Sequence, residues 1–414
     1  MEAERWICNA TLIDGLGNAP IERGSVVIAD GRIQAVGADL EPPAGADVID
    51  AGGRTIVPGF VNLHSHLLRR FRVDDPPLMS TVAMVVRGVR NAREALAQGI
   101  TTARELGAPN YLDVQLRDLI DQGGVIGPRI LACARPITRT GGHNCDFSRE
   151  ADGPDEVRKA VREQLKAGAD CLKVMASWGG IEIGREHRRL KLPGAPAPAY
   201  AAYTVEEMRA AVDEAHAANK RVTVHAESAP SVLRAVEAGV DSVEHGTHLT
   251  DEAVAAMVEA GVYYSPTIST VYRRVAAADS GTGQSWGGDV MYWARLATEP
   301  WMVSLKKAVA AGVKIATGTD AGGDIVMEIQ LIAEAGLSPL EAIRSGTSRA
   351  AEAIGRPDLS ALEPGRLADV VIVDGRPDRD LACLANVWMV VKDGKIAPLG
   401  ASQAATADPA LVLA

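Results

Sequence analysis

The sequence is poor in cysteine and contains no C-x-x-C pair. Its five cysteines are widely scattered, and an odd number cannot form a complete set of disulfide bonds. This pattern indicates neither a disulfide-stabilised secreted domain nor a structural zinc knuckle. We therefore expect every cysteine to be a reduced thiol, most of them in the core: Cys8, Cys133, Cys145, Cys171 and Cys383.

The chain also lacks an excess of positive charge, because 43 Lys and Arg residues stand against 53 Asp and Glu, for a formal net charge of -10. Without a basic surface to neutralise phosphates, we expect no nucleic-acid partner, no membrane partner and a small-molecule substrate. No apolar run reaches the roughly 18–20 residues that span a bilayer. The start, MEAERWICNATLIDG, has acidic residues where a secretory signal would be basic, so we expect a cytoplasmic protein.

What the chain does have is length and apolar content, with 414 residues of which 47% are hydrophobic. A barrel of roughly 250–330 residues with a small companion domain would account for this length. Short β-rich runs separated by turns occupy residues 5–55 and return near the end in ADVVIVDG and VWMVVKDGKI. We expect residues 1–56 and 366–414 to form one discontinuous β-sandwich beside a barrel of residues 57–365.

Between these β-rich ends, short apolar runs alternate with longer Ala/Glu/Arg-rich stretches, which is typical of βα units on a parallel sheet. One helix start is marked by a capping box, Thr204 followed by Glu207. The strand-like runs are TIVPGFVNLH, ITTARELG, RILACARPI, CLKVMAS, RVTVHAE, DSVEHG, VYYSPTI and KIATGTDAG. Eight such units predict an α/β fold with a (β/α)8 TIM-like barrel, whose catalytic residues lie at the carboxyl ends of strands.

Residues that can bind metal lie at several of these strand ends. His64 and His66 occupy alternate positions, so both side chains face one side of the sheet, although this spacing alone is a weak signal. Lys173 ends the fourth run among apolar residues, where it could extend to the barrel mouth or react with CO2 to form a metal-bridging carbamate.

Three further strand ends carry His225, His245 and Asp320. A single histidine there is often structural, and an aspartate before glycine is often a turn residue. The combination points to a metal centre, because five of the eight strand-like runs end in a ligand-type residue.

Through PGFVNLHSH, CLKVMAS, TVHAE, SVEHG and GTDAG, the sequence resembles the amidohydrolase superfamily over essentially its whole length. TTARELG, TRTGGH and LKVMAS make it similar to the imidazolonepropionase-related and prolidase-like branch, whose members hydrolyse Xaa-Pro dipeptides, N-acyl amino acids and other amides. The resemblance implies two divalent ions, expected to be zinc. Their implied ligands are His64, His66 and Asp320 for the buried ion, His225 and His245 for the more exposed ion, and carboxylated Lys173 for both.

The resemblance also implies a mechanism, in which a hydroxide bridging the metals attacks the carbonyl and Asp320 carries the proton to the leaving amine. His143, in TRTGGH, matches a position that steadies the substrate carbonyl, although a loop histidine without a role is an alternative. Dipeptidases of this branch often have a tyrosine at the position of Glu227 in this chain. We expect Glu227 to bind the substrate. A simple dipeptidase is therefore in doubt.

The segment WGGIEIGREHRRLKLPGAPAPAYAAY after the fourth strand is expected to be a loop over the barrel mouth. Its arginines could hold a substrate carboxylate or form a merely solvated basic loop: Arg185, Arg188 and Arg189. We expect His187 on this solvated loop, His216 on an exposed helix, and a structural or indirect role for His248.

Other activities remain open at this point. The same binuclear centre could hydrolyse a lactone, carbamate or organophosphate. A mononuclear deaminase is disfavoured, because such enzymes read H-x-x-E on the fifth strand, whereas Glu227 follows His225 by two residues. A metal-free scaffold is also disfavoured, because no ligand is lost. For the active enzyme we expect a homo-oligomer.

Overall fold

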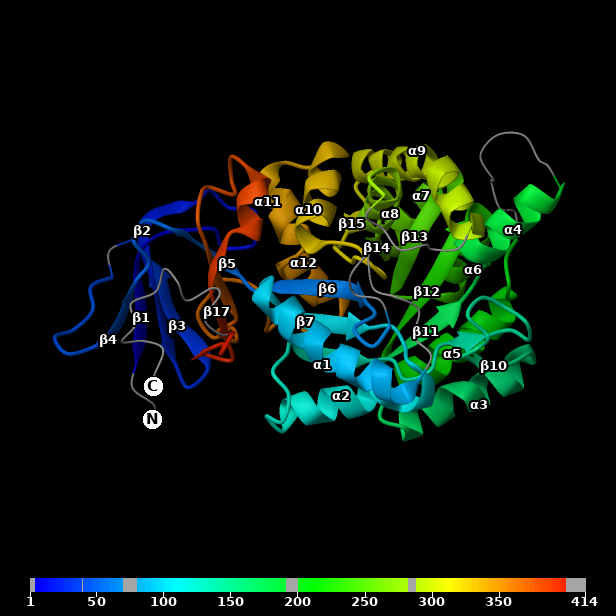
Figure 1. The fold of residues 1–414 in the computed structure, drawn as a ribbon, viewed down its shortest axis with the longest axis horizontal. Helices are drawn as coiled ribbons and strands as arrows, with labels where there is room; N and C mark the ends of the chain where they lie inside the picture. The colour runs from blue at the N-terminus through cyan, green and yellow to red at the C-terminus, as the bar shows by residue number, and fades with distance from the viewer. Residues whose placement is uncertain (1–3, 39, 70–79, 191–199, 282–287, 400–414) are drawn as a thin grey trace.

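The protein has two structural parts in the computed structural model, which describes residues 4–38, 40–69, 80–190, 200–281 and 288–399. A mixed sheet is built from strands that lie near the two ends of the sequence, and a larger barrel of strands and helices lies beside it (Figure 1). Within the described residues no helix is both long and apolar enough to cross a membrane.

Strands from both ends of the chain build the mixed sheet, in the order β18-β17-β16-β5-β1-β2-β3, with β4 paired to β1. Its strands are β1 (Arg5–Leu12), β2 (Ile21–Ala29), β3 (Arg32–Gly37), β4 (Asp47–Asp50), β5 (Thr55–Pro58), β16 (Val370–Val373), β17 (Val387–Lys392) and β18 (Lys395–Ile396). Ile7, Ile56 and Val370 belong to its own apolar core. The predicted discontinuous β-domain is confirmed, whereas its boundaries at residues 56/57 and 365/366 stay a prediction.

The barrel is built from parallel strands. They are β6 (Phe60–Ser65), β7 (Ile100–Glu105), β8 (Arg129–Ala132), β11 (Cys171–Met175), β12 (Arg221–Ser228), β13 (Ser242–His248), β14 (Tyr263–Ser265) and β15 (Lys314–Ile315). The first three of these strands form one sheet and the other five belong to a second sheet. Backbone hydrogen bonds join the two sheets, from Leu63 N to Thr317 O at 3.0 Å and from Asp170 N to Ala132 O at 2.7 Å. The predicted (β/α)8 barrel is confirmed.

The helices surround the barrel and alternate with its strands (Figure 1). They are α1 (Thr81–Ala97), α2 (Leu112–Asp121), α3 (Gly153–Lys166), α4 (Gly180–Leu190), α5 (Val205–Ala217), α6 (Ala229–Ala238), α7 (Asp251–Ala260), α8 (Ser269–Asp279), α9 (Gly288–Ala310), α10 (Ile325–Glu334), α11 (Pro339–Ser345) and α12 (Ser348–Ala353). The predicted capping box starts α5, because Thr204 Oγ1 accepts from Glu207 N and Glu207 accepts from Thr204 N. His216 is exposed on this helix, as predicted.

Two strand predictions were wrong in their bounds. The run TIVPGFVNLH is two strands, because β5 belongs to the mixed sheet and β6 to the barrel. The chain changes sheets at Gly59, where a Cβ would lie 2.2 Å from Thr101 Oγ1, so only glycine permits this approach. RILACARPI likewise contains β8 and the start of the short strand β9 (Ile137–Thr138), which pairs with β10 (Arg149–Glu150).

The predicted mouth loop was also wrong in part, because residues 180–190 form helix α4, while residues 191–199 lie outside the described part of the chain. Helix α4 packs on α9, and a Cβ at Gly184 would meet Asp289 O at 2.2 Å. His187 is consequently buried rather than solvated, with Nδ1 2.9 Å from Tyr292 Oη. Packing against α9 stabilises a helix that the Gly- and Pro-rich sequence did not indicate.

Candidate metal centre

A cavity of about 650 Å³ at the barrel mouth gathers most of the predicted site residues. Its lining includes His64, His66, His143, Lys173, Arg185, His225, Glu227, His245 and Asp320. These residues are separated by up to 256 positions in the sequence, and the barrel brings them together because parallel strands end at one rim.

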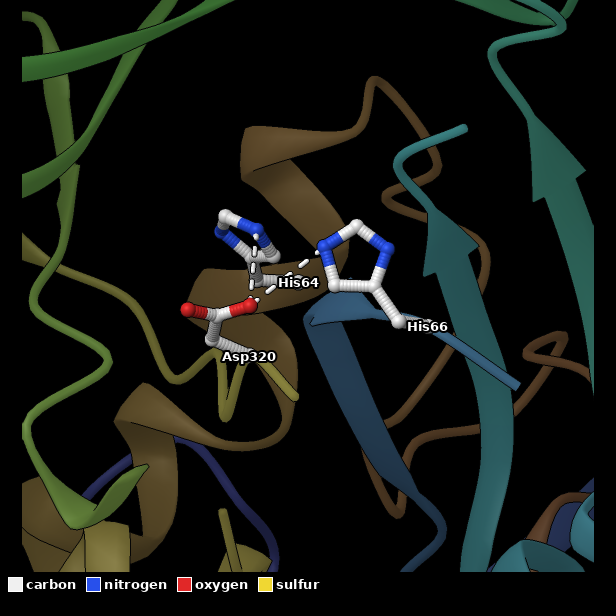
Figure 2. Close-up of side chains that lie close together, drawn as sticks. All are labelled: His64, His66 and Asp320. Carbon is white, nitrogen blue, oxygen red and sulfur yellow. Dashed lines mark ion pairs between the residues drawn. The ribbon is translucent and has the colours of Figure 1, made fainter. Parts of the chain in front are cut away.

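The first possible metal-binding group consists of His64, His66 and Asp320, whose ligand atoms lie within 4.8 Å of one another. Asp320 Oδ1 lies 3.6 Å from His64 Nε2 and 3.3 Å from His66 Nε2, and Figure 2 shows the carboxylate facing both rings. Both histidines are buried. Two imidazoles and one carboxylate are a donor set that suits zinc.

The second group consists of His225, Glu227 and His245, also with ligand atoms within 4.8 Å. Glu227, which we predicted to bind substrate, therefore lies beside the two histidines predicted to bind metal. It is buried, and its Oε2 accepts a short hydrogen bond from Thr247 Oγ1. The two groups are close, because the rings of His64 and His245 are centred 5.0 Å apart.

Lys173 projects from β11 into the same cavity and is only 2% exposed. Its Nζ has no hydrogen-bond partner among the described residues. A buried ammonium without a hydrogen-bond partner is costly, so this position favours the neutral amine or its conversion to another group.

The backbone at two of the candidate ligands is strained. His245 has φ of 74° and Asp320 has φ of 56°, which is the left-handed region that residues with a side chain rarely adopt. Such strain persists where the surrounding structure fixes it, and it is common at functional sites. Here it turns the chain sharply just where these two side chains enter the cavity.

Burial governs the ionisation of these groups. It lowers the pKa of His66 to about 4 and, with His64 nearby, holds the pKa of His245 well below its usual range, so both rings are neutral at pH 7. Neutral imidazole is the form that binds metal. Burial also lowers the pKa of Lys173 to about 8 and raises the pKa of Glu227 to about 8.

The sequence was compared with known protein families, and residues 55–397 match the model of the amidohydrolase family. The chain belongs to the amidohydrolase family. It is an enzyme, a hydrolase that acts on C–N bonds.

Individual amidohydrolases are similar to it along nearly their whole length. Ochratoxinase from Aspergillus niger is 28% identical, with 95% of this chain and 87% of that protein covered. A solved Xaa-Pro dipeptidase with bound methionine in its active site is 31% identical, covers 95% of this chain and 99% of its own, and has a TM-score of 0.83. A prolidase complexed with N-methylphosphonate-L-proline is 29% identical, with coverage of 95% and 99% and a TM-score of 0.82.

The histidines of this amidohydrolase are oriented by other side chains, which we did not predict. His64 Nδ1 lies 2.9 Å from Glu244 Oε2, and Glu244 Oε1 accepts from Arg104 Nη2 at 2.6 Å. His245 Nδ1 lies 2.8 Å from Thr267 Oγ1. A carboxylate on one ring nitrogen directs the other nitrogen to the metal position. The signal was present, because Glu244 and Arg104 are charged residues inside apolar strand runs and had to be paired.

His143 lies between β9 and β10 rather than on a long strand, and it lines the cavity. Its ring stacks on His225 with centroids 4.5 Å apart, and its Nδ1 lies 2.9 Å from Glu182 Oε2. Although burial raises the pKa of Glu182, the hydrogen bond from His143 lowers it overall. His248 is half-buried at the end of β13 and is not among the described residues that line the cavity.

The three predicted arginines all lie on α4 and differ in position. Arg185 lines the cavity, with Nε 3.7 Å from Asp289 Oδ2. Arg188 donates to the same carboxylate at 2.9 Å and Arg189 lies 3.7 Å from Glu186, and neither belongs to the described cavity lining.

An arginine that no motif indicated also lines this cavity. Arg274 on α8 is only 8% exposed, with Nη2 4.0 Å from Asp320 Oδ2. Only the fold brings it here, because it lies on a helix after the seventh barrel strand, in a segment without a distinctive sequence.

Proposed function

We propose that this amidohydrolase uses two divalent metal ions, expected to be zinc, to hydrolyse an amide bond of a small molecule. The proposed substrate is a dipeptide, an N-acyl amino acid or a related amide with a carboxylate on its leaving side. The observation that carries the proposal is the buried, unpartnered Lys173 Nζ in a cavity with two groups of ligand-type side chains.

The residues present fit a carbamate bridge. CO2 reacts only with the neutral amine, and burial lowers the pKa of Lys173 to about 8, so a usable fraction is neutral near pH 7. The carbamate would replace a buried cation by an anion with two oxygens. His64, His66 and Asp320 would hold one ion, and His225 and His245 the other, with Glu227 near enough to join the second set.

When bound, the two ions supply an activated water near neutral pH and a Lewis acid for the carbonyl oxygen. Asp320 then takes the proton of the attacking water and gives it to the leaving nitrogen, because amines leave poorly unless protonated. His143 steadies the carbonyl oxygen from its place on the cavity wall. Glu244 and Thr267 keep the rings of His64 and His245 in position.

The rest of the cavity supports the proposed substrate class. Arg185 is the α4 arginine placed to contact a carboxylate, because Arg188 and Arg189 lie outside the lining. Phe147 and Trp293 supply apolar walls. The similar Xaa-Pro dipeptidase and prolidase support a substrate with an amino-acid leaving group. Glu227, where such dipeptidases often have tyrosine, favours a substrate different from a simple dipeptide.

The test is a substrate panel with the zinc-loaded enzyme in bicarbonate buffer, including dipeptides, N-acyl amino acids, uncharged amides, carbamates and lactones. We expect turnover of amides that carry the carboxylate, loss of activity with a chelator, and recovery on adding zinc. Turnover of lactones or carbamates alone would replace the amide proposal, and release of ammonia from a heterocycle would indicate a deaminase instead.

A further inference from the structure

His143 is held both by its neighbour in the chain and by a residue from a different segment. Its loop between β9 and β10 provides Asn144, whose Nδ2 lies 3.0 Å from His143 Nε2. The other ring nitrogen, Nδ1, lies 2.9 Å from Glu182 Oε2 in the first turn of α4. The segment after β11 therefore contacts a histidine that lies 39 residues earlier in the chain, in the loop that follows the neighbouring strand β9.

The contact is closely fitted. Gly179 lies against the ring, and a Cβ there would be 2.3 Å from His143 Cε1, so no larger residue fits without displacing the histidine. Glu182 Oε2 also accepts from Gly179 N at 3.2 Å, so one carboxylate oxygen ties both the ring and the peptide beside it. On its other side the ring stacks on His225 at an interplanar angle of 25°.

The hydrogen bond also fixes a proton on one ring nitrogen. A carboxylate accepts but cannot donate, so His143 Nδ1 carries a proton and donates to Glu182, while Nε2 lies 3.0 Å from Asn144 Nδ2. Glu182 itself is not among the described residues that line the cavity, and its side chain is 26% exposed. We therefore expect Glu182 to act on the reaction through His143 and not by touching the substrate.

We infer that Glu182 is a positioning residue, which fixes the orientation of the His143 ring on the cavity wall and holds a proton on its Nδ1. This inference rests on the function proposed above. It assigns a role in specificity and rate to the start of α4. This helix follows β11, whereas His143 lies in the loop between β9 and β10. By analogy with carboxylates that orient metal-binding histidines, its removal costs about 10–100-fold in activity.

The kinetic test is a double-mutant cycle on the best substrate of the panel. Glu182→Ala is expected to lower kcat by about 10–100-fold with little change in KM, and Glu182→Gln, which keeps an acceptor oxygen, to recover most of it. In the His143→Ala background the same Glu182→Ala change is expected to alter kcat less than about twofold. Equal losses in both backgrounds would mean that Glu182 only supports α4 and would overturn the inference.

A second measurement does not depend on turnover. Long-range ¹H–¹⁵N spectra of the zinc-loaded protein report histidine tautomers, and the His143 signal is identified by its loss in His143→Ala. We expect a protonated Nδ1 in the wild type and a changed signal in Glu182→Ala. Glu186→Ala, one turn along the same helix and 42% exposed, is the matched control that leaves the signal unchanged. An unchanged signal in Glu182→Ala overturns the inference, even if the enzyme hydrolyses amides as proposed. A changed signal in an enzyme that hydrolyses no amide disproves the proposed amide substrate and leaves the role of Glu182 standing.

Discussion

At the scale of single residues, the candidate ligands lie at or near the ends of barrel strands, whereas Glu182 and Arg274 lie on the helices α4 and α8. His64, Lys173 and Asp320 could be named as candidates because each lies near the end of a strand-like run of the sequence, and the strand ends of a barrel share one rim. Glu182 and Arg274 could not, because their positions depend on how helices pack over that rim. The roles of all these residues in metal and substrate binding stay predictions.

Lys173→Ala tests the carbamate. With the bridge removed, we expect at least one divalent ion per chain to be lost and nearly all activity with it. Elemental analysis after dialysis in zinc and bicarbonate measures the metal content. Lys220→Ala, a half-buried lysine near Asp170, is the control and should keep both ions. Full metal content and normal turnover in Lys173→Ala would remove the carbamate from the mechanism.

Asp320→Asn tests the proton carrier. Asparagine keeps the shape but cannot carry the proton, so we expect kcat to fall by roughly 10²-fold or more. Metal content must be measured in the same samples, because Asp320 is also a candidate ligand. Asp251→Asn, whose side chain is 90% exposed, serves as the control. If the Asp320 variant keeps its ions and turns over within a few-fold of wild type, another residue carries the proton.

At the scale of elements, the sequence predicted the alternation of strands and helices. The two elements that it predicted wrongly have physical explanations. TIVPGFVNLH looked like one strand because nothing local reveals that Gly59 crosses between sheets against Thr101. Helix α4 looked like a loop because its stability comes from α9, through the Gly184 contact and the buried His187. Both errors arise from tertiary packing, which periodicity does not contain.

Arg185→Gln tests whether α4 binds the substrate carboxylate. Because Arg185 is 68% exposed, we expect a modest effect, about a tenfold rise in KM for a carboxylate substrate, and little change for the matched neutral amide. Arg189→Gln should change neither value, because Arg189 pairs with Glu186 outside the cavity lining. Equal KM changes for the two substrates would show that Arg185 does not recognise the carboxylate, and Arg274 would become the next candidate.

At the scale of the whole molecule, the barrel and the discontinuous sheet were both predicted, while the contacts that join them were not. Arg129 on β8 donates to Asp369 Oδ2 at 2.8 Å and forms a short hydrogen bond with Asp393. Asp369 is fully buried and lies just before β16 of the mixed sheet. No pattern in the sequence connects residues more than 200 positions apart. The predicted homo-oligomer and cytoplasmic location stay predictions, the former measurable by light scattering.

Arg129→Met tests this junction. Removing the arginine leaves the buried Asp369 carboxylate without its charged partner, although Asp393 N still donates to it, so we expect a loss of about 3 kcal/mol of stability with kcat nearly unchanged. The shift of the urea midpoint measures the loss. Arg5→Met breaks a more exposed ion pair with Asp47 and should cost less than about 1 kcal/mol. Equal shifts in the two variants would show that the junction adds no more than a surface pair.

The position of β5 between β1 and β16 has a consequence for biosynthesis. Thr55 pairs with Val373, so the centre of the mixed sheet is completed only after about 300 further residues have left the ribosome, roughly 15–60 s later at usual elongation rates. Until then, one edge of β5 has no partner, and unpaired edges promote aggregation. Since β5 continues into β6 through Gly59 alone, a nascent chain cut short before β16 would expose that edge beside the strand that carries His64. Such fragments should be strong clients of cellular chaperones.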